Sequence, residues 1–152
     1  MSNGKPQETG PVIARAAEVE KEIEKLRNLD TLKAEDLVRM ARDLGKDLAR
    51  YMNTSQIRRF LDEVNRIRSD SRLQKEGQSF RESCMLLKPK LAYAAGRQKG
   101  GGQRERQQGQ AIKDLMQVLV PCIDKVHDEK DFYKFYRFVE SIVAYHRYYG
   151  GE

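Results

Sequence analysis

The chain has few of the side chains on which enzymes and metal sites rely. Its 152 residues include two histidines, His127 and His146, and two cysteines, Cys84 and Cys122. No HExxH motif occurs, and no cysteine–histidine spacing is typical of a zinc site, which needs three or four converging ligands. We therefore expect no catalytic residue, no metal ligand, no cofactor and no enzymatic activity.

Long apolar runs are also missing. No segment approaches the roughly 20 consecutive apolar residues of a membrane-spanning helix, and the first eight residues are polar, unlike a signal peptide. The two cysteines stand in apolar segments without CxxC spacing, which favours buried thiols in a reducing compartment, although a disulfide between them is compatible with the sequence. We expect a cytoplasmic protein without a membrane partner.

Residues 98–109 contain four glycines and no hydrophobic side chain. The glycines at 100–102 do not form a phosphate-binding loop, because the segment lacks GxxxxGK[ST] and follows no predicted strand. We interpret residues 98–109 as a flexible, glycine-rich basic loop.

Apolar residues recur at helical spacing through most of the remaining chain, and no convincing strand pattern is present. Longer amphipathic helices are predicted around the stripes of residues 12–26, 37–51, 57–67, 112–126 and 132–146. Two shorter helices are predicted between Ser79 and Gly96, separated where Lys88 precedes Pro89. Gly96 is expected to end the second of them in the left-handed region. Thr54 is the expected N-cap of the third long helix.

This pattern predicts the fold class and its boundaries. The chain is expected to be all-α, a compact helical bundle of about five longer and two shorter helices. Residues 1–11, polar and rich in glycine and proline, are interpreted as a disordered N-terminal leader. Residues 12–150 are then expected to form a single helical-bundle domain.

The net charge of +6 is distributed unevenly. Residues 55–106 carry thirteen lysines and arginines against six acids, whereas residues 1–54 balance at ten against ten. Residues 107–152 hold six basic and seven acidic side chains. A localised basic surface between neutral flanks indicates a polyanionic partner, most simply the backbone of a nucleic acid.

The third predicted helix carries Arg58, Arg59 and Arg66 opposite its apolar stripe. On an ideal helix Arg59 and Arg66 are about 20° apart. A solvent-exposed surface of ion pairs is the competing interpretation, because Asp62 and Glu63 follow Arg58 and Arg59 at four-residue spacing.

More basic residues follow with a single acid, Glu105, among them. They are Lys88, Lys90, Arg97, Lys99, Arg104 and Arg106. A row of ammonium and guanidinium groups at helix ends and loops holds successive phosphates without reading bases. This accumulation favours a nucleic-acid surface over a merely solvated one.

Three segments then resemble a known family. They are TSQIRRF at 54–60, LKPKLAYAAGR at 87–97 and FVESIVAYHRYYG at 138–150. In order and spacing they resemble the small subunit of type III-A CRISPR effector complexes, the Csm complexes, over residues 34–150.

The resemblance implies a non-catalytic helical subunit of an antiviral ribonucleoprotein. Members stack in several copies beside the backbone subunits and the large subunit, and they contact the sugar–phosphate backbone of guide and target RNA without sequence preference. It implies partners of three kinds: guide and target RNA, other Csm subunits, and further copies of the chain along the filament. The family's basic positions map onto Arg58, Arg59, Lys88, Lys90 and Arg97. We add Arg66 from the helix geometry and Lys99 from the charge of the loop.

Two other functions remain open at this point. Helices at 35–51 and 55–68, joined by a short turn, are compatible with a helix-turn-helix DNA-binding regulator that has Arg58 and Arg59 at the start of its recognition helix. A helical protein-interaction adaptor without nucleic-acid affinity is the second alternative.

Overall fold

The computed structural model of the chain describes residues 10–70, 80–97 and 102–152. Every regular element in these ranges is helical, which confirms the predicted all-α bundle. The elements are α1 (Ala16–Glu24), the 3-10 turn η1 (Leu29–Thr31), α2 (Ala34–Leu48), α3 (Thr54–Ser69), α5 (Phe80–Met85), α6 (Leu87–Arg97), α7 (Gln103–Asp124) and α8 (Glu129–Tyr148). None of the described helices is long and apolar enough to cross a membrane.

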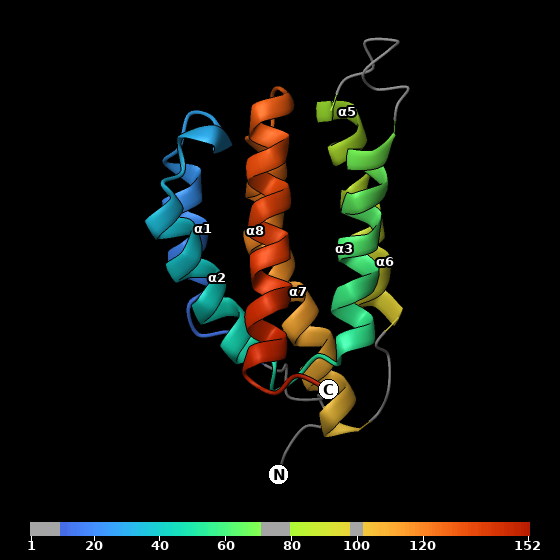
Figure 1. Cartoon of the computed structure of the whole chain (residues 1–152). Helices are drawn as coiled ribbons and strands as arrows, with labels where there is room; N and C mark the ends of the chain where they lie inside the picture. Colours follow the sequence, from blue (N-terminus) through green and yellow to red (C-terminus); the bar gives the residue numbers. More distant parts are fainter. Residues whose placement is uncertain (1–9, 71–79, 98–101) are drawn as a thin grey trace, which may run out of the picture.

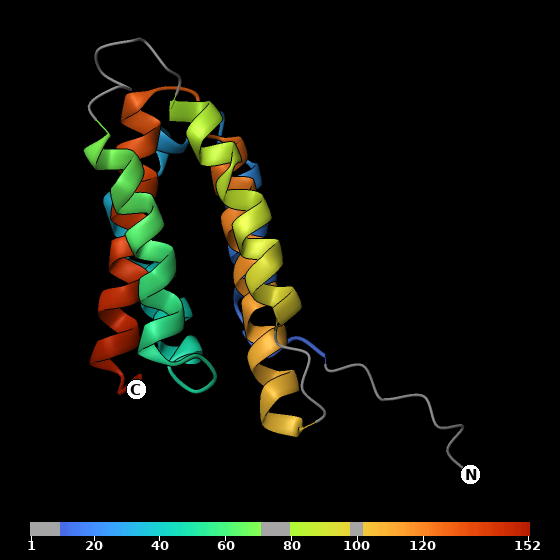
Figure 2. The same cartoon turned by 90° about the vertical axis from the view of Figure 1, so that its right-hand side faces the viewer.

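The long helices form two layers (Figure 1). Helix α8 packs between α2 and α3, and α7 packs between α1 and α6. The short helix α5 contacts α3 and α8 of one layer and α6 and α7 of the other. Figure 2 shows the two layers edge-on, diverging as they run away from α5. The layers are therefore bridged by α5 at one end and lie farther apart at the other.

Phenylalanines of α8 pack against α3 and α5. Phe132 and Phe135 are fully buried, as the apolar stripe of this segment predicts, and Phe138, which the stripe did not include, is fully buried as well. Phe132 stacks on Phe80 of α5 with ring centroids 4.9 Å apart, and Phe135 meets Phe60 of α3 edge-to-face at 6.5 Å. Each fully buried phenylalanine contributes about 1.5–3 kcal/mol of transfer free energy, so these contacts fix the position of α3.

Two buried carboxylates accept hydrogen bonds from backbone N–H groups that have no partner within a helix. Asp114 of α7 is 3% exposed and accepts hydrogen bonds from the backbone nitrogens of Val12 and Ile13 at 2.7 and 2.9 Å. Asp131 of α8 is 1% exposed and accepts one from Asp30 at 2.8 Å. Because an unpaired buried N–H costs about 1–3 kcal/mol, Asp114 ties the chain before α1 to the middle of α7, and Asp131 ties the chain before α2 to the first turn of α8.

The start of α3 differs from its prediction. The N-cap is Asn53, which accepts a hydrogen bond from the Gln56 nitrogen at 2.9 Å, while the Gln56 side chain accepts one from Asn53 at 3.1 Å. The prediction of Thr54 as the cap is wrong, because the Thr54 hydroxyl donates instead to the carbonyl of Gly151 at 3.1 Å. The Thr54 nitrogen donates to the carbonyl of Glu152 at 2.7 Å, so the last residues of the chain hold the first turn of α3.

The boundary between α5 and α6 is also displaced. The helical run breaks at Leu86, and Lys88 and Pro89 both lie in the first turn of α6. A proline is tolerated there because its missing N–H has no partner within the helix. Gly96 is helical, and Gly150 is the one described glycine with a positive φ, so the expectation that Gly96 ends the helix in the left-handed region is wrong.

The prediction of a loop over residues 98–109 is wrong for the second half of that segment. Helix α7 begins at Gln103 with Gly102 as its N-cap, so residues 103–109 are helical. Glutamine, arginine and glutamate have high intrinsic helix propensity. Residues 103–108 therefore extend α7 at its N-terminal end, although the buried residues of α7 begin only at Gly109. Residues 98–101 lie outside the described part of the chain, as do residues 1–9 of the predicted leader.

Candidate nucleic-acid interface

A groove opens between α3 and α6 where the two layers diverge. The two helices run in opposite directions along it (Figure 1). Its volume is about 670 Å³, and Ile112 and Leu115 of α7 line it together with residues of α3 and α6. The apolar stripes of α3, α6 and α7 thus meet at the bottom of the groove, and the charged faces of α3 and α6 form its rim.

Four of the predicted basic residues lie on this rim. Arg59 and Arg66 come from α3, and Lys90 and Arg97 come from α6. Each pair is seven residues apart on one helix face, which corresponds to about 10.5 Å at 1.5 Å per residue. A strand of duplex DNA carries one phosphate per about 3.4 Å of helix axis, so each wall spans about three phosphates.

Acidic side chains compensate one end of the groove. Glu63 contacts Lys90 Nζ through Oε2 and Arg66 Nη1 through Oε1, the latter at 3.1 Å. The Glu63 side chain is 25% exposed, whereas those of Arg66 and Lys90 are 75% and 54% exposed, so water reaches both cations of this cluster. The two cations at this end therefore already have a carboxylate neighbour.

The opposite end is uncompensated. Arg59 lies in the first half of α3 and Arg97 is the last residue of α6, so the antiparallel course of the helices puts both at the end where the layers are farther apart. Both side chains are exposed, and neither forms an ion pair within the described residues. Arg97 does contact the Tyr93 ring, with its guanidinium carbon 5.8 Å from the ring centroid. Two guanidinium groups without a carboxylate partner among the described residues thus lie on opposite walls of the groove, toward its open end.

The remaining predicted residues lie elsewhere. Arg58 is exposed on α3 but does not line the groove. Lys88 donates to the Asp124 carboxylate of α7 at 2.5 Å, on a different side of α6. Arg104 is in the helical part of α7 rather than in a loop. Lys99 lies outside the described residues.

Sequence reasoning missed Tyr93 and the role of Glu63. Tyr93 is 69% exposed on the α6 wall of the groove, three residues after Lys90 and four before Arg97. That spacing puts it on the face of α6 that carries both cations, and this signal was present in the sequence. The competing interpretation paired Glu63 with Arg59, but Glu63 contacts Arg66 of its own helix and Lys90 of α6 instead. Helix spacing alone does not predict the contact with Lys90.

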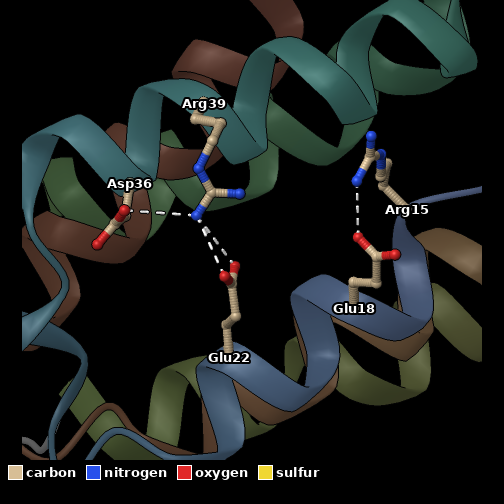
Figure 3. A network of polar contacts seen from close by, with 5 residues as sticks. All are labelled: Arg15, Glu18, Glu22, Asp36 and Arg39. Carbon is tan, nitrogen blue, oxygen red and sulfur yellow. Dashed lines mark hydrogen bonds and ion pairs between the residues drawn. The ribbon is translucent and has the colours of Figure 1, made fainter.

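Helices α1 and α2 present a different charged surface (Figure 3). Arg39 of α2 donates to Glu22 of α1 at 3.2 Å and to Asp36 at 3.4 Å, and Arg15 donates to Glu18 at 2.8 Å. Hydrogen bonding to Glu22 and then to Asp36 raises the pKa of Arg39 above its ordinary value. Arg15 and Arg39 are thus each paired with neighbouring carboxylates.

The cysteines and histidines do not form a catalytic group in the described structure. Cys84 and Cys122 are buried and free, as interpreted from the sequence, and burial raises the pKa of the Cys84 thiol to about 12. His146 is fully buried with Nε2 2.6 Å from the carbonyl oxygen of Met52. Among the residues described, no group of three or more histidines, cysteines or carboxylates is placed to hold a metal ion.

Comparison with known families decides the assignment. The family model described as Csm2 Type III-A matches residues 31–152. The chain belongs to the Csm2 family. Comparison with curated protein sequences gives no match. The matched range contains α3, α6 and α7 in full, so all three helices of the groove are part of the family's common sequence, whereas α1 precedes it.

Family membership identifies the assembly. As a Csm2 protein the chain is a small subunit of a type III-A CRISPR complex, and its partners include other subunits of the Csm complex. The resemblance noted over residues 34–150 is thereby confirmed.

Proposed function

We propose that this subunit binds the sugar–phosphate backbone of guide and target RNA through the α3–α6 groove, without sequence preference and without catalysis. The observation that carries the proposal is the pair of unpaired guanidinium groups, Arg59 and Arg97, on opposite walls of one groove. Guanidinium groups bind phosphate oxygens in a bidentate manner and carry no sequence information in such contacts. Arg66 and Lys90 extend the same surface.

The balance of charge along the groove supports a polyanionic ligand. Four cations and two acids, Asp62 and Glu63, line it, which leaves an excess of two positive charges. A surface of this kind attracts RNA from a distance and binds it with a strong dependence on salt. We also propose that Arg58, Lys88 and Lys99 contribute to the general field rather than to the groove itself.

Two further parts of the proposal concern the assembly. Several copies associate along the complex, each contributing one weak RNA site, and joining such sites raises their effective concentration. The subunit acts in the cytoplasm, where guide RNA and the other Csm subunits are present.

The geometry favours this function over a helix-turn-helix regulator. In such a motif the two helices pack against each other, whereas α2 and α3 lie on opposite sides of α8 (Figure 1). An adaptor without nucleic-acid affinity differs from our proposal in one measurable respect, because it has no RNA affinity even at low salt.

The test is binding of the full chain to labelled RNA over a salt series, followed by fluorescence anisotropy. We use two unstructured RNAs of unrelated sequence and a matched DNA duplex. The expected result is similar affinity for both RNAs, with log Kd rising against log salt with a slope of about 1.4 to 2.8, that is about 0.7 for each of two to four phosphate contacts. Tight binding to the DNA duplex alone, or no RNA binding at low salt, would contradict the proposal.

A further inference from the structure

Phosphate contacts explain the rim of the groove but not its interior. A surface that holds only phosphates needs exposed cations and no depth. Yet the groove reaches down to α7 and has a volume of about 670 Å³, within the range of about 300–1,000 Å³ typical of pockets for small organic ligands. Its walls also carry aromatic rings, Phe60 on α3 and Tyr93 on α6. The interior therefore suits a flat apolar group.

Tyr93 differs from the other aromatic side chain in the groove. Phe60 is half-buried and held edge-to-face against Phe135 of the core. Tyr93 is 69% exposed, and Arg97, one of the two unpaired cations, lies 5.8 Å from the centre of its ring. An exposed ring beside a guanidinium group is the usual platform on which a nucleobase stacks while its phosphate is bound.

We propose that the α3–α6 groove takes the base of an unpaired nucleotide. Tyr93 stacks on the base, Phe60 lines the opposite wall, and Arg59 and Arg97 hold the adjoining phosphates. Stacking tolerates every base because each has a π-face, so the site remains indifferent to sequence. This inference rests on the proposed function and narrows its ligand to RNA with accessible bases.

The experiment compares two probes on the full chain: an oligouridylate, and an RNA of the same length made of abasic ribonucleotides. The abasic strand keeps every phosphate and loses every base. We expect the wild-type chain to bind the oligouridylate about tenfold more tightly, consistent with the value of one stacked base. The variant Tyr93→Ala is expected to lose this difference and to bind the abasic strand as the wild type does.

Two matched variants control the result. Tyr93→Phe keeps the ring and is expected to keep the preference for bases. Tyr148→Ala removes a ring that is 77% exposed on α8 and does not line the groove, so it is expected to change neither affinity. An equal loss in Tyr148→Ala and Tyr93→Ala would overturn the inference.

A spectroscopic readout reports the contact directly. The chain contains no tryptophan, so Tyr93→Trp introduces a single tryptophan whose emission is quenched when a base stacks on it. We expect quenching by the oligouridylate and none by the abasic strand. Equal affinity of the wild type for both probes, or unchanged emission on binding, would overturn base insertion and leave phosphate binding intact. Failure of both probes to bind at low salt would overturn the proposed function as well.

Discussion

The α3–α6 groove and the α1–α2 surface are both rich in arginine, yet their arginines are in different electrostatic situations. On the α1–α2 surface, Arg39 lies between Glu22 and Asp36, and Arg15 meets Glu18 (Figure 3). In the groove, Arg59 and Arg97 have no acidic partner among the described residues. We therefore take the basic residues that lack a carboxylate partner, and not all basic residues of a surface, as the candidates for phosphate contact.

Within the groove, too, some cations have a carboxylate partner and others do not. Its end near Glu63 is compensated, and its end at Arg59 and Arg97 is not. A phosphate that binds at the compensated end competes with a carboxylate already in place, so less free energy is available there. The open end is where we expect most of the RNA affinity to arise.

The largest expected effect is a loss of stability when the contact that holds the chain before α1 is removed. Asp114→Ala removes the acceptor of two backbone N–H groups before α1 and is expected to lower the free energy of unfolding by about 2 kcal/mol. Arg39→Ala, whose side chain is 42% exposed, is expected to cost less than about 1 kcal/mol. Urea denaturation followed by far-UV circular dichroism measures both.

The two variants are expected to differ in how their loss of stability depends on salt. The loss in Arg39→Ala is expected to shrink at high ionic strength because exposed ion pairs are screened, while the loss in Asp114→Ala persists. A larger cost for Arg39→Ala than for Asp114→Ala would mean that the ion pairs, and not the buried carboxylate, hold α1 on the bundle.

A smaller effect, on RNA affinity, is expected when the negative charge at the compensated end of the groove is removed. Glu63→Gln keeps the shape of the side chain and frees Lys90 and Arg66 from their shared carboxylate. RNA affinity at low salt is expected to rise about threefold, because one negative charge near the phosphates is lost. Glu22→Gln removes a carboxylate from the α1–α2 network in the same way and is expected to leave RNA affinity unchanged. Weaker RNA binding by Glu63→Gln would exclude phosphate contacts at this end.

Much of the fold followed from periodicity. The stripe on residues 132–146 correctly predicted the buried face of α8, and the seven-residue spacing of Arg59 and Arg66 correctly predicted that both lie on one face of α3. The helical start of α7 was missed because its first residues carry no apolar stripe, and only propensity indicates a helix there. The break at Leu86 was misplaced because a proline in a first helical turn and a proline after a helix end look alike in sequence.

Of the seven residues predicted to bind RNA, the structure brings Arg59, Arg66, Lys90 and Arg97 to one groove, whereas Arg58 and Lys88 lie outside it. Their contact with RNA stays a prediction. That Glu63 neutralises Lys90 depends on how α3 and α6 pack, and the two residues are 27 positions apart. Pairing across helices is a tertiary property, so the free and the compensated cations are distinguished only in the folded chain.

The most direct measurement compares two matched double variants in the RNA anisotropy assay. Arg59→Gln with Arg97→Gln removes the two unpaired cations of the groove, and Arg15→Gln with Arg39→Gln removes the same charge from the α1–α2 surface. We expect the groove variant to lose more than about tenfold in affinity for every RNA sequence and about 1.4 in salt slope, and the other variant to bind as the wild type does. Equal losses in the two variants would show that net charge, and not the groove, holds the RNA, and would contradict the assignment.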